Sequence, residues 1–392
     1  MTARHLDAIP PYVFYELDAR RAAMRAKGKS LIDVGIGSPD GPMPDVVVEA
    51  LQQIAQDRSV AGYPYFQAHP AYAAAVAGYL SDRFGVVIDP AREMLALAGS
   101  KEGIAELLLA HCNPGDVVLV PEVYYPVYAR ATQLAGAEPV FVPFRADGGM
   151  DLDAVSAEHL ARARVLLVNY PSNPTTHAVS LDELARYVAF AESRGLLLLS
   201  DLAYSELSYD GFVVPSVLQV PGASRVAVET HTCSKSFSMA GVRIAFVAGK
   251  QDAIARLDAY RSNIGYGVST LAQHAGAAAF THHASLVPVT VARYRARRDA
   301  VAAALAQGGW QVSPPNATMY YWLDVPSGFG DWEWVDALMQ GPGVVVTPGI
   351  AFGAAGQGKF RVSLVQPEAT MVRAVKGILD VARAGPPSNT AN

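Results

Sequence analysis

Short apolar segments alternate with helical patterns through much of this 392-residue chain. The apolar segments, each five or six residues long, lie at 93–98, 116–120, 138–143, 164–169, 196–200, 225–229 and 243–247. Helical patterns separate several of them, at 101–111, 127–135 and 181–194. Strands buried on both faces have nearly continuous apolar sequences, and parallel strands are joined through helices. The pattern therefore predicts an α/β fold with a mostly parallel central sheet that helices cover on both faces.

The chain is longer than one ordinary core requires, and its pattern changes after about Ala284. An Arg-rich helix is expected over 289–306, then strands at 320–325, 344–347 and 360–365 and a helix from Glu368. Before the sheet, helices are expected at 12–27, 44–57 and 71–84, and a strand at 31–36. We therefore expect an N-terminal arm that forms part of a small domain (1–44), a large domain (45–284) and a small C-terminal α/β domain (285–392).

The composition excludes several classes of protein. A net charge of −5 without any long Lys/Arg run argues against a nucleic-acid partner. Cys112 and Cys233 lie far apart without metal-ligand spacing, so we expect no metal site, no disulfide and a cytoplasmic location. Residues 1–21 lack the apolar core of a signal peptide. The stretch 262–292 has no Asp, Glu, Lys or Arg but several polar residues, which favours buried helices over a membrane span.

Lys235 is the strongest catalytic candidate. It lies in the run 232–243 (TCSKSFSMAGVR), between hydroxyl residues and eight positions before Arg243. Its amine can form an imine with an aldehyde cofactor while the hydroxyls and the arginine bind that cofactor's phosphate. Asp201 follows the apolar run 196–200, where a carboxylate can meet a pyridine nitrogen, although an N-cap aspartate is a serious alternative. Together these residues predict a pyridoxal phosphate enzyme.

Further candidates follow other strands. Ser100 and Lys101 come after the strand at 93–98 and open a helix, where free amides bind anions, although an ordinary N-cap serine is the commoner explanation. Asn173 lies between two prolines after the strand at 164–169 and can bond a phenolic oxygen; a turn asparagine is equally consistent. Ligands of open parallel sheets bind beyond the carboxyl ends of the strands, so these residues are expected to share one site.

Two tyrosines and one arginine complete the predicted site. Tyr204, three residues after Asp201, can reach the cofactor's O3′, and Tyr125 can stack on its ring, although buried tyrosines more often serve packing. Arg361 lies in a β-like segment and is a natural clamp for a substrate carboxylate; an exposed strand arginine is an equal alternative. Each residue alone has an ordinary explanation, but the joint order along the chain is much more specific.

With these residues identified, the chain resembles the class I/II aminotransferases of pyridoxal phosphate fold type I over nearly its full length. Within that family it is most similar to the LL-diaminopimelate aminotransferase branch and related aspartate/alanine-type enzymes. The segments that carry the likeness are IPPYVF (9–14), DVGIGSPD (33–40), GSKEGI (99–104), PGDVVLVP (114–121) and NYPSNPT (169–175).

The resemblance implies a role for each candidate. Lys235 would be the catalytic lysine, Asp201 the partner of the pyridine nitrogen, and Tyr125 the stacking residue. Contacts to O3′ would come from Asn173 and Tyr204. The phosphate would be bound by Ser100, Lys101, Thr232, Ser234 and Arg243, together with Tyr63 of a neighbouring subunit, with Ser262 and Asn263 near the partner's site. The substrate would be bound by Gly37, Arg361, Asn173 and Tyr12. A homodimer follows from the role of Tyr63.

The chain departs from the family pattern at four places. Thr176 replaces the glycine that usually follows Asn-Pro-Thr, Val242 replaces a tryptophan, and Gly265 stands where relatives often have an aspartate. The segment 63–68 (YPYFQA) lacks the glutamate that the branch often uses to bind the substrate's distal ammonium. Without this partner, a buried ammonium would lose about 2–5 kcal/mol of binding free energy. The departures concern substrate choice rather than the cofactor residues.

The expected function is transamination between an amino acid and a 2-oxo acid by a ping-pong mechanism, of diaminopimelate type or with a diverged specificity. Aromatic residues hint at a mixed pocket, although they can equally be core: Tyr12, Tyr15, Tyr65, Phe66 and Tyr320. A lyase, cyclase or decarboxylase of the same fold is the close alternative. A non-catalytic pyridoxal phosphate-binding regulator fits less well, because no basic helix-turn-helix precedes the fold.

Overall fold

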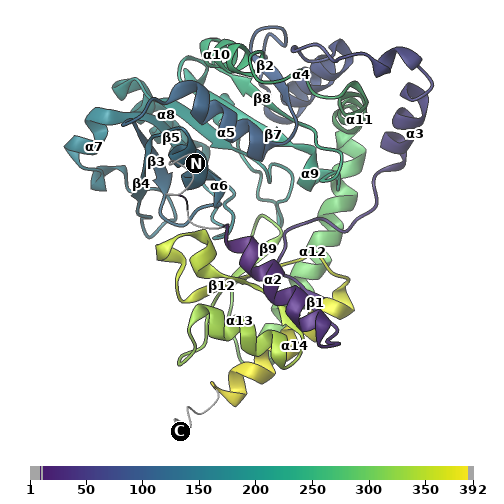
Figure 1. Ribbon diagram of the computed structural model, residues 1–392, viewed down its shortest axis with the longest axis vertical. Coiled ribbons are helices and arrows are strands. Elements are labelled where there is room, and N and C mark those ends of the chain that lie inside the picture. Colours follow the sequence, from purple (N-terminus) through teal and green to yellow (C-terminus); the bar gives the residue numbers. More distant parts are fainter. Residues whose placement is uncertain (1–8, 10–11, 387–392) are drawn as a thin grey trace, which may run out of the picture.

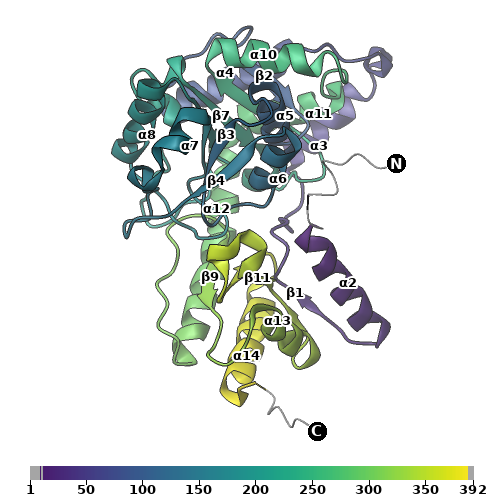
Figure 2. The same ribbon diagram turned by 60° about the vertical axis from the view of Figure 1, so that its left-hand side comes forward.

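The computed structural model describes residue 9 and residues 12–386, so Pro10 and Pro11 of the 9–14 segment lie outside the described residues. The chain forms a large body around one sheet and a smaller body below it, and helix α12 (His283–Gln307) runs from one to the other (Figures 1 and 2). Helix α2 (Val13–Ala26) lies along the smaller body, so the beginning and end of the described chain meet there (Figure 1).

The seven-stranded sheet of the large body has the order β2-β8-β7-β6-β5-β3-β4. Its strands are β2 (Met94–Leu97), β3 (Val117–Pro121), β4 (Glu138–Val142), β5 (Ala163–Val168), β6 (Leu197–Asp201), β7 (Ala227–Thr232) and β8 (Ala245–Gly249). Every neighbouring pair is parallel except those made by β8, which is antiparallel to both β2 and β7. The predicted mostly parallel sheet is confirmed.

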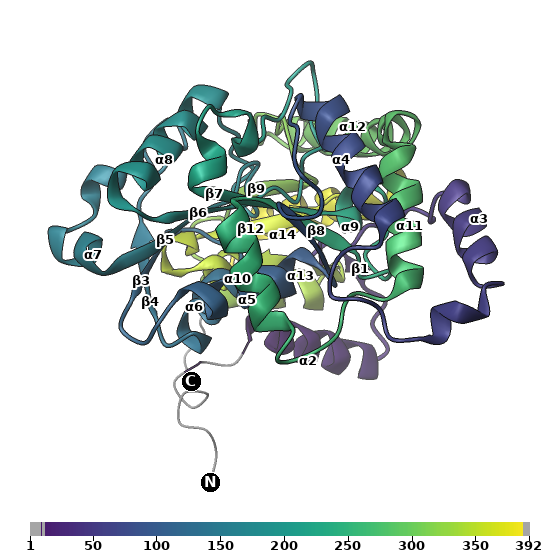
Figure 3. The same ribbon diagram turned by 90° about the horizontal axis from the view of Figure 1, so that it is seen from above.

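Helices cover both faces of this sheet (Figure 3). One face packs against α5 (Ser100–His111), α6 (Val127–Leu134) and α10 (Gln251–Arg261). The other packs against α4 (Pro70–Phe84), α8 (Leu181–Arg194) and α11 (Thr270–Thr281), with α3 (Asp45–Ile54) alongside α11. The uncharged stretch at 262–292 forms α11, which packs on α4 with Ala272, Ala275 and Ala279 buried, and the start of α12. The prediction of buried helices holds for α11 only, because Ile264, Tyr266 and Val289 of the same stretch are exposed in the single chain.

Strand β7 corrects the predicted strand at 225–229, because it continues to Thr232 through polar residues. Glu229, fully buried, appeared to end the strand, but its carboxylate accepts bonds from hydroxyls and an amide of neighbouring segments. The partners are Ser200 Oγ at 3.0 Å, Ser216 Oγ at 2.5 Å and Val217 N at 3.0 Å, with His231 Nε2 at 2.9 Å. A buried acid with such partners is tolerated inside a sheet. This extension carries the strand to the position of Lys235.

The smaller body is built from both ends of the chain. Its elements are β1 (Ile32–Asp33), β9 (Tyr320–Asp324), α13 (Asp331–Gln340), β10 (Val344–Val345), β11 (Thr347–Pro348), β12 (Lys359–Ser363) and α14 (Glu368–Ala384). The predicted strand at 31–36 is only β1, which pairs in parallel with β10. Arg297 of α12 holds the segment after β1 through two 2.7 Å bonds to the carboxylate of Asp40. No helix of the described residues is long and apolar enough to cross a bilayer.

The loop after β5 contains one backbone conformation that suits glycine better than the residue present. Thr176 has a φ of 64°, in the left-handed region. Its amide bonds the carbonyl of Ser172 at 3.0 Å, and the amide of Ser172 bonds the carbonyl of His177 at 2.8 Å, so the turn is fixed. A β-branched side chain in this region costs about 1–2 kcal/mol. The sequence departure at this position is therefore a strained turn.

We predict that Thr176→Gly stabilises the protein. The relief of backbone strain exceeds the extra conformational entropy that glycine gives the unfolded chain, leaving a gain of about 1 kcal/mol or a rise in Tm of about 2 °C. The neighbouring Thr175→Gly is the matched control, because Thr175 is buried and has no positive φ. Thermal unfolding should show opposite signs for the two variants, and a lowered Tm for both contradicts the assignment of strain.

Candidate active site

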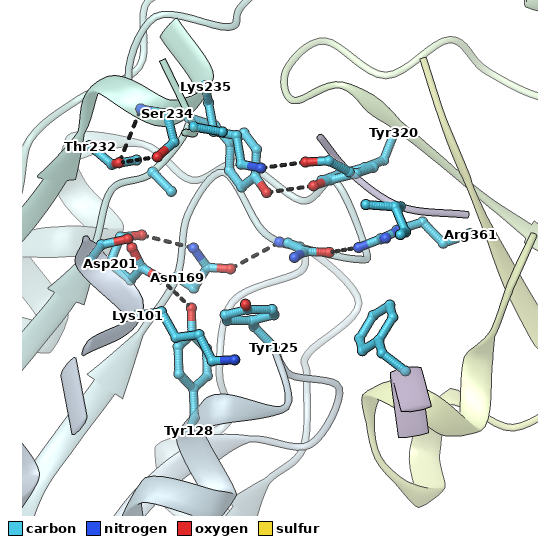
Figure 4. A pocket seen from close by; sticks show the side chains of 18 of the residues that line it. Lys101, Tyr125, Tyr128, Asn169, Asp201, Thr232, Ser234, Lys235, Tyr320 and Arg361 are labelled. Carbon is cyan, nitrogen blue, oxygen red and sulfur yellow. Dashed lines mark hydrogen bonds between the residues drawn. The ribbon is translucent and has the colours of Figure 1, made fainter. Parts of the chain in front are cut away.

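A pocket of about 370 Å³ lies at the carboxyl ends of the central strands, where the two bodies meet (Figure 4). All thirteen site residues that the sequence predicts within one subunit line it, including Tyr12, which lies just before α2. The lining residues are Tyr12, Phe14, Ile36, Gly37, Ser100, Lys101, Tyr125, Tyr128, Asn169, Asn173, Asp201, Ala203, Tyr204, Thr232, Ser234, Lys235, Ala240, Arg243, Tyr320 and Arg361. The sequence candidates that followed separate strands thus share one site.

Lys235 follows β7 in the single helical turn α9 (Cys233–Ser236). Thr232 Oγ1 caps this turn by accepting from the amide of Ser234 at 3.1 Å, and it bonds Ser234 Oγ at 2.9 Å. The Lys235 ammonium donates to the carbonyl of Gly37, which belongs to the segment after β1 (Figure 4). Burial lowers the pKa of Lys235. A lysine with a lowered pKa is more readily neutral, which is the form that acts as nucleophile or base.

Asp201 ends β6 and is almost fully buried. Its two carboxylate oxygens each accept one bond. Oδ2 accepts from the Tyr128 hydroxyl at 2.7 Å (Figure 4), and Oδ1 accepts from Thr230 Oγ1 at 3.2 Å. Burial raises the pKa of Asp201 to about 6, although both hydroxyl bonds act to lower it. Its backbone carbonyl accepts from Asn169 Nδ2 at 2.8 Å. The carboxylate is oriented and lacks a cationic partner among the described side chains that bond it.

Arg243 and the start of α5 form one end of the pocket. Gly99, the residue before the helix, has a φ of 145°, and an added Cβ would lie 2.2 Å from Arg243 Nη2. Arg243 Nη2 bonds both carboxylate oxygens of Glu102 at 2.9 Å, and its side chain is 46% exposed. Ser100 opens the helix, whose first amides have no intrahelical partner. Arginine, hydroxyl and helix amides together suit a phosphate group.

Arg361, on β12, forms the other end. Its Nη1 donates to Asn173 Oδ1 at 2.7 Å and its Nη2 to the carbonyl of Gly35 at 2.6 Å. The guanidinium is 2% exposed and lies over the ring of Tyr320, 4.3 Å from its centroid. Its Nε has no partner. A buried arginine bonded only to neutral oxygens can donate to and bind a carboxylate.

Two side chains take positions that the sequence did not indicate. The Tyr204 hydroxyl bonds the hydroxyl of Tyr320, 2.7 Å away on β9. Lys101, expected at the phosphate, directs its ammonium over the ring of Tyr12, 4.7 Å from the centroid. The backbone amide of Lys101, at the start of α5, remains free to bind an anion beside Arg243. The charged side-chain ammonium of Lys101 lies elsewhere in the pocket.

Tyr63 lies outside the pocket of its own chain. Its side chain is 79% exposed, and its ring stacks on that of Tyr266 with centroids 4.2 Å apart. Of the aromatic residues expected in a mixed pocket, Tyr12 and Tyr320 line it. The other three, Tyr15, Tyr65 and Phe66, do not line it and are exposed to solvent.

The sequence reasoning missed several lining residues, of which Tyr128 and Asn169 bond Asp201. Tyr128, in the first turn of α6, lies three residues after Tyr125, and their ring centroids are 5.8 Å apart. This closeness in sequence could have indicated Tyr128 as a pocket residue, although not as the partner of Asp201. The sequence indicated Asn169 only as the first residue of the segment 169–175, not as a partner of Asp201. The remaining missed residues are small or apolar and carried no chemical signal: Phe14, Ile36, Ala203 and Ala240.

The pocket fits pyridoxal 5′-phosphate on structural grounds. Buried Asp201 requires a cationic hydrogen-bond donor, which a protonated pyridine nitrogen supplies. Glycine at position 99 leaves space beside Arg243, where a phosphate needs it. The amine of Lys235 lies in the same pocket. The groups required at three different points of this cofactor are therefore all present.

Comparison with known proteins agrees with this chemistry. The family model described as "Aminotransferase class I and II" matches residues 29–378. LL-diaminopimelate aminotransferase of Desulforudis audaxviator is 41% identical over 95% of this chain and 96% of that protein. The corresponding enzyme of Gloeobacter violaceus is 40% identical over 95% and 96%.

Solved structures show the same similarity. Substrate-bound BacF from Bacillus subtilis superposes with a TM-score of 0.94 at 28% identity, covering 100% of both chains. A probable N-succinyldiaminopimelate aminotransferase from Thermus thermophilus superposes with a TM-score of 0.89 at 36% identity, covering 94% of this chain and 100% of that one.

We predict that Tyr128→Phe moves the acid limit of cofactor binding to higher pH. Ionised Asp201 would pair with the pyridinium, so the affinity for the cofactor should fall as the pH drops through the Asp201 pKa of about 6. Removing a donor to the ionised carboxylate raises that pKa further, by about one unit. The measurement is the Kd of pyridoxal phosphate between pH 5 and 8.5, in a Lys235→Ala background where no covalent bond contributes.

Tyr72→Phe is the matched control, because the buried Tyr72 hydroxyl bonds the carbonyl of Ala245 instead. The ionisable groups of the cofactor itself titrate equally in all variants, so they do not affect the difference between two Kd–pH profiles. Identical pH profiles for the Tyr128 and Tyr72 variants would show that the Tyr128 hydroxyl does not tune Asp201.

Proposed function

This chain belongs to the class I and II aminotransferase family and moves an amino group between an amino acid and a 2-oxo acid; we propose that it does so with pyridoxal 5′-phosphate at Lys235 and with a donor that carries a second carboxylate. The observation that carries the substrate assignment is the Lys101 ammonium, which lies in the pocket without a carboxylate partner among the described lining residues.

Each end of the pocket has residues for one part of the cofactor. Arg243, Ser234 and the amides that open α5 would hold the phosphate, Asp201 the pyridine nitrogen, and Tyr204 with Asn173 the phenolic oxygen. Tyr125 would cover one face of the ring. When bound, the cofactor supplies an aldehyde that reacts with amines and a ring that accepts electrons from the substrate's Cα.

The protein's own groups then position the substrate and move its proton. Arg361 would bind the α-carboxylate. Its Nη2 is held by the carbonyl of Gly35 and its Nε is free to donate, so the bound carboxylate would orient Cα in the pocket. Lys235, once released by the incoming amine, would take the proton from Cα and return one to the cofactor carbon, because its lowered pKa supplies the neutral amine. The second half-reaction runs the same steps in reverse with another 2-oxo acid.

A charge inventory supports a dicarboxylic donor. The pocket contains four cationic side chains (Lys101, Lys235, Arg243 and Arg361), whereas Asp201 is its single carboxylate among the described lining residues. Arg243, which already bonds Glu102, would also bind the phosphate, Arg361 would bind the α-carboxylate, and Lys235 would be bonded to the cofactor. Lys101 remains, and a second substrate carboxylate neutralises it.

Three of the named relatives carry the name of a substrate of this kind, diaminopimelate or its N-succinyl derivative. Diaminopimelate carries a carboxylate and an ammonium at its distal end, and its N-succinyl derivative replaces that ammonium with a neutral amide. The segment 63–68 has Phe66 and Gln67 but no acid. A missing acid favours a donor whose distal nitrogen is neutral or absent over LL-diaminopimelate itself.

The same segment supports a homodimer. Tyr63, Tyr65, Ile264 and Tyr266 have exposed fractions between 56% and 86%, and Phe66 stacks on Tyr266 with centroids 5.8 Å apart. An exposed aromatic cluster of this kind marks an interface. A second copy would cover it and bring Tyr63 to the neighbouring phosphate, as the family resemblance implies.

We predict that single-turnover mixing with a suitable amino acid gives one 2-oxo acid and the aminated cofactor, without ammonia or CO2. L-glutamate, L-aspartate, LL-diaminopimelate, N-succinyl-LL-diaminopimelate and L-alanine form the donor panel. Lys101→Met should raise KM about fivefold for donors with a second carboxylate, because an exposed ion pair contributes about 1 kcal/mol, and leave KM for L-alanine unchanged.

Lys235→Ala is the negative control for turnover, and Lys101→Arg, which keeps the charge, should restore most of the dicarboxylate preference. Equal losses for L-alanine and the dicarboxylic donors in Lys101→Met would contradict the substrate assignment while leaving transamination intact.

We also predict that mixed subunits recover activity. Lys235→Ala and Tyr63→Ala homodimers should both be impaired, but a heterodimer of the two has one site with an intact lysine and an intact partner tyrosine. Random reassociation should restore about a quarter of the wild-type rate. Absence of recovery, with heterodimers confirmed by mass spectrometry, would place the action of Tyr63 within its own subunit.

A further inference from the structure

Tyr320 lines the pocket between the two bodies, close to Lys235 and to Arg361 (Figure 4). It begins β9 in the small body, is 1% exposed, and bonds the Tyr204 hydroxyl of the large body at 2.7 Å. The guanidinium of Arg361 lies over its ring. A Cβ added at Gly37 would lie 2.2 Å from its hydroxyl, so glycine at that position leaves the space that this hydroxyl occupies.

The two hydroxyls share one hydrogen bond, and each has a single proton. Under the proposed function, Tyr204 donates its proton to the phenolic oxygen of the cofactor. Tyr204 then has no proton left for its neighbour, so Tyr320 must donate and Tyr204 must accept. The positive charge of Arg361 over the ring draws electron density from the Tyr320 oxygen, which makes its hydroxyl a better donor.

We propose that Tyr320 is a positioning residue that fixes the direction of the Tyr204 proton towards the cofactor and connects the carboxylate-binding arginine to it. This inference rests on the proposed function. Accepting a bond strengthens the bond that a hydroxyl donates, so Tyr320 makes Tyr204 a stronger donor. Filling space is the alternative role, since the Tyr320 ring belongs to the hydrophobic core of the small body.

Tyr320→Phe separates the two roles, because it keeps the ring and its contact with Arg361 and removes only the hydroxyl. The Tyr204 proton and the proton on the lysine–cofactor linkage both stabilise charge on the same phenolic oxygen. Weakening the first bond makes the linkage hold its proton to higher pH. We expect the visible absorbance change of the bound cofactor to titrate about one pH unit higher than in wild type, and kcat to fall while KM changes little.

Tyr321→Phe is the matched control. Tyr321 is the next residue of β9, equally buried, and its hydroxyl bonds the carbonyl of Arg298 at 2.7 Å, away from the pocket. Its titration should match wild type. Tyr204→Phe should shift the titration as well, and the double variant Tyr204→Phe/Tyr320→Phe should shift no further than Tyr204→Phe alone, because Tyr320 acts through Tyr204.

An unshifted titration in Tyr320→Phe, or a double variant whose shift equals the sum of the two single shifts, would overturn this inference. Those outcomes leave the proposed function standing, because wild type would still show a lysine-bound cofactor that titrates. A wild-type protein that shows no cofactor absorbance after incubation with pyridoxal phosphate would instead refute the proposed function.

Discussion

The burial of the Asp201 carboxylate is the constraint on which the site depends. A carboxylate removed from water without a cation is unfavourable, and here the hydroxyls of Tyr128 and Thr230 hold both oxygens while its pKa remains raised. A cationic ring nitrogen would supply the missing partner. The carboxyl end of β6 thus carries a buried carboxylate without a cation among the described side chains that bond it, and this supports the proposed cofactor.

The pocket is formed by two bodies, and three of the hydrogen bonds that join them involve residues lining the pocket. Lys235 bonds the carbonyl of Gly37, Arg361 bonds Asn173, and Tyr204 bonds Tyr320. Each bond joins a residue near the central sheet to one in the small body or the segment that leads to it. A change in the position of the small body therefore alters the base, the carboxylate site and the phenol pair together, which links substrate binding to the arrangement of the reacting groups.

The sequence predicted the sheet because strands buried on both faces have apolar sequences, and it predicted the pocket because polar residues followed those strands. It could not predict which hydroxyl faces Asp201, since Tyr128 reaches it from a helix 73 positions away in the chain. The antiparallel β8 also escaped prediction, because an apolar run carries no signal of direction. Strand β7 looked shorter than it is, since the partners that make Glu229 acceptable inside the sheet come from other segments.

Lys101 shows how a correct motif can contain a residue with a different task. The GSK sequence predicts an anion site at the start of α5, and the backbone there supports it. The ammonium of Lys101, however, lies over the ring of Tyr12. Tyr12 comes from the beginning of the described chain and Arg361 from near its end, but both line the same pocket. Backbone amides at this helix start can bind phosphate without the lysine charge, so the side chain is available for selecting the substrate. Within Gly99, Ser100 and Lys101, substrate specificity can therefore change through the lysine side chain without a change in the backbone that would bind the phosphate.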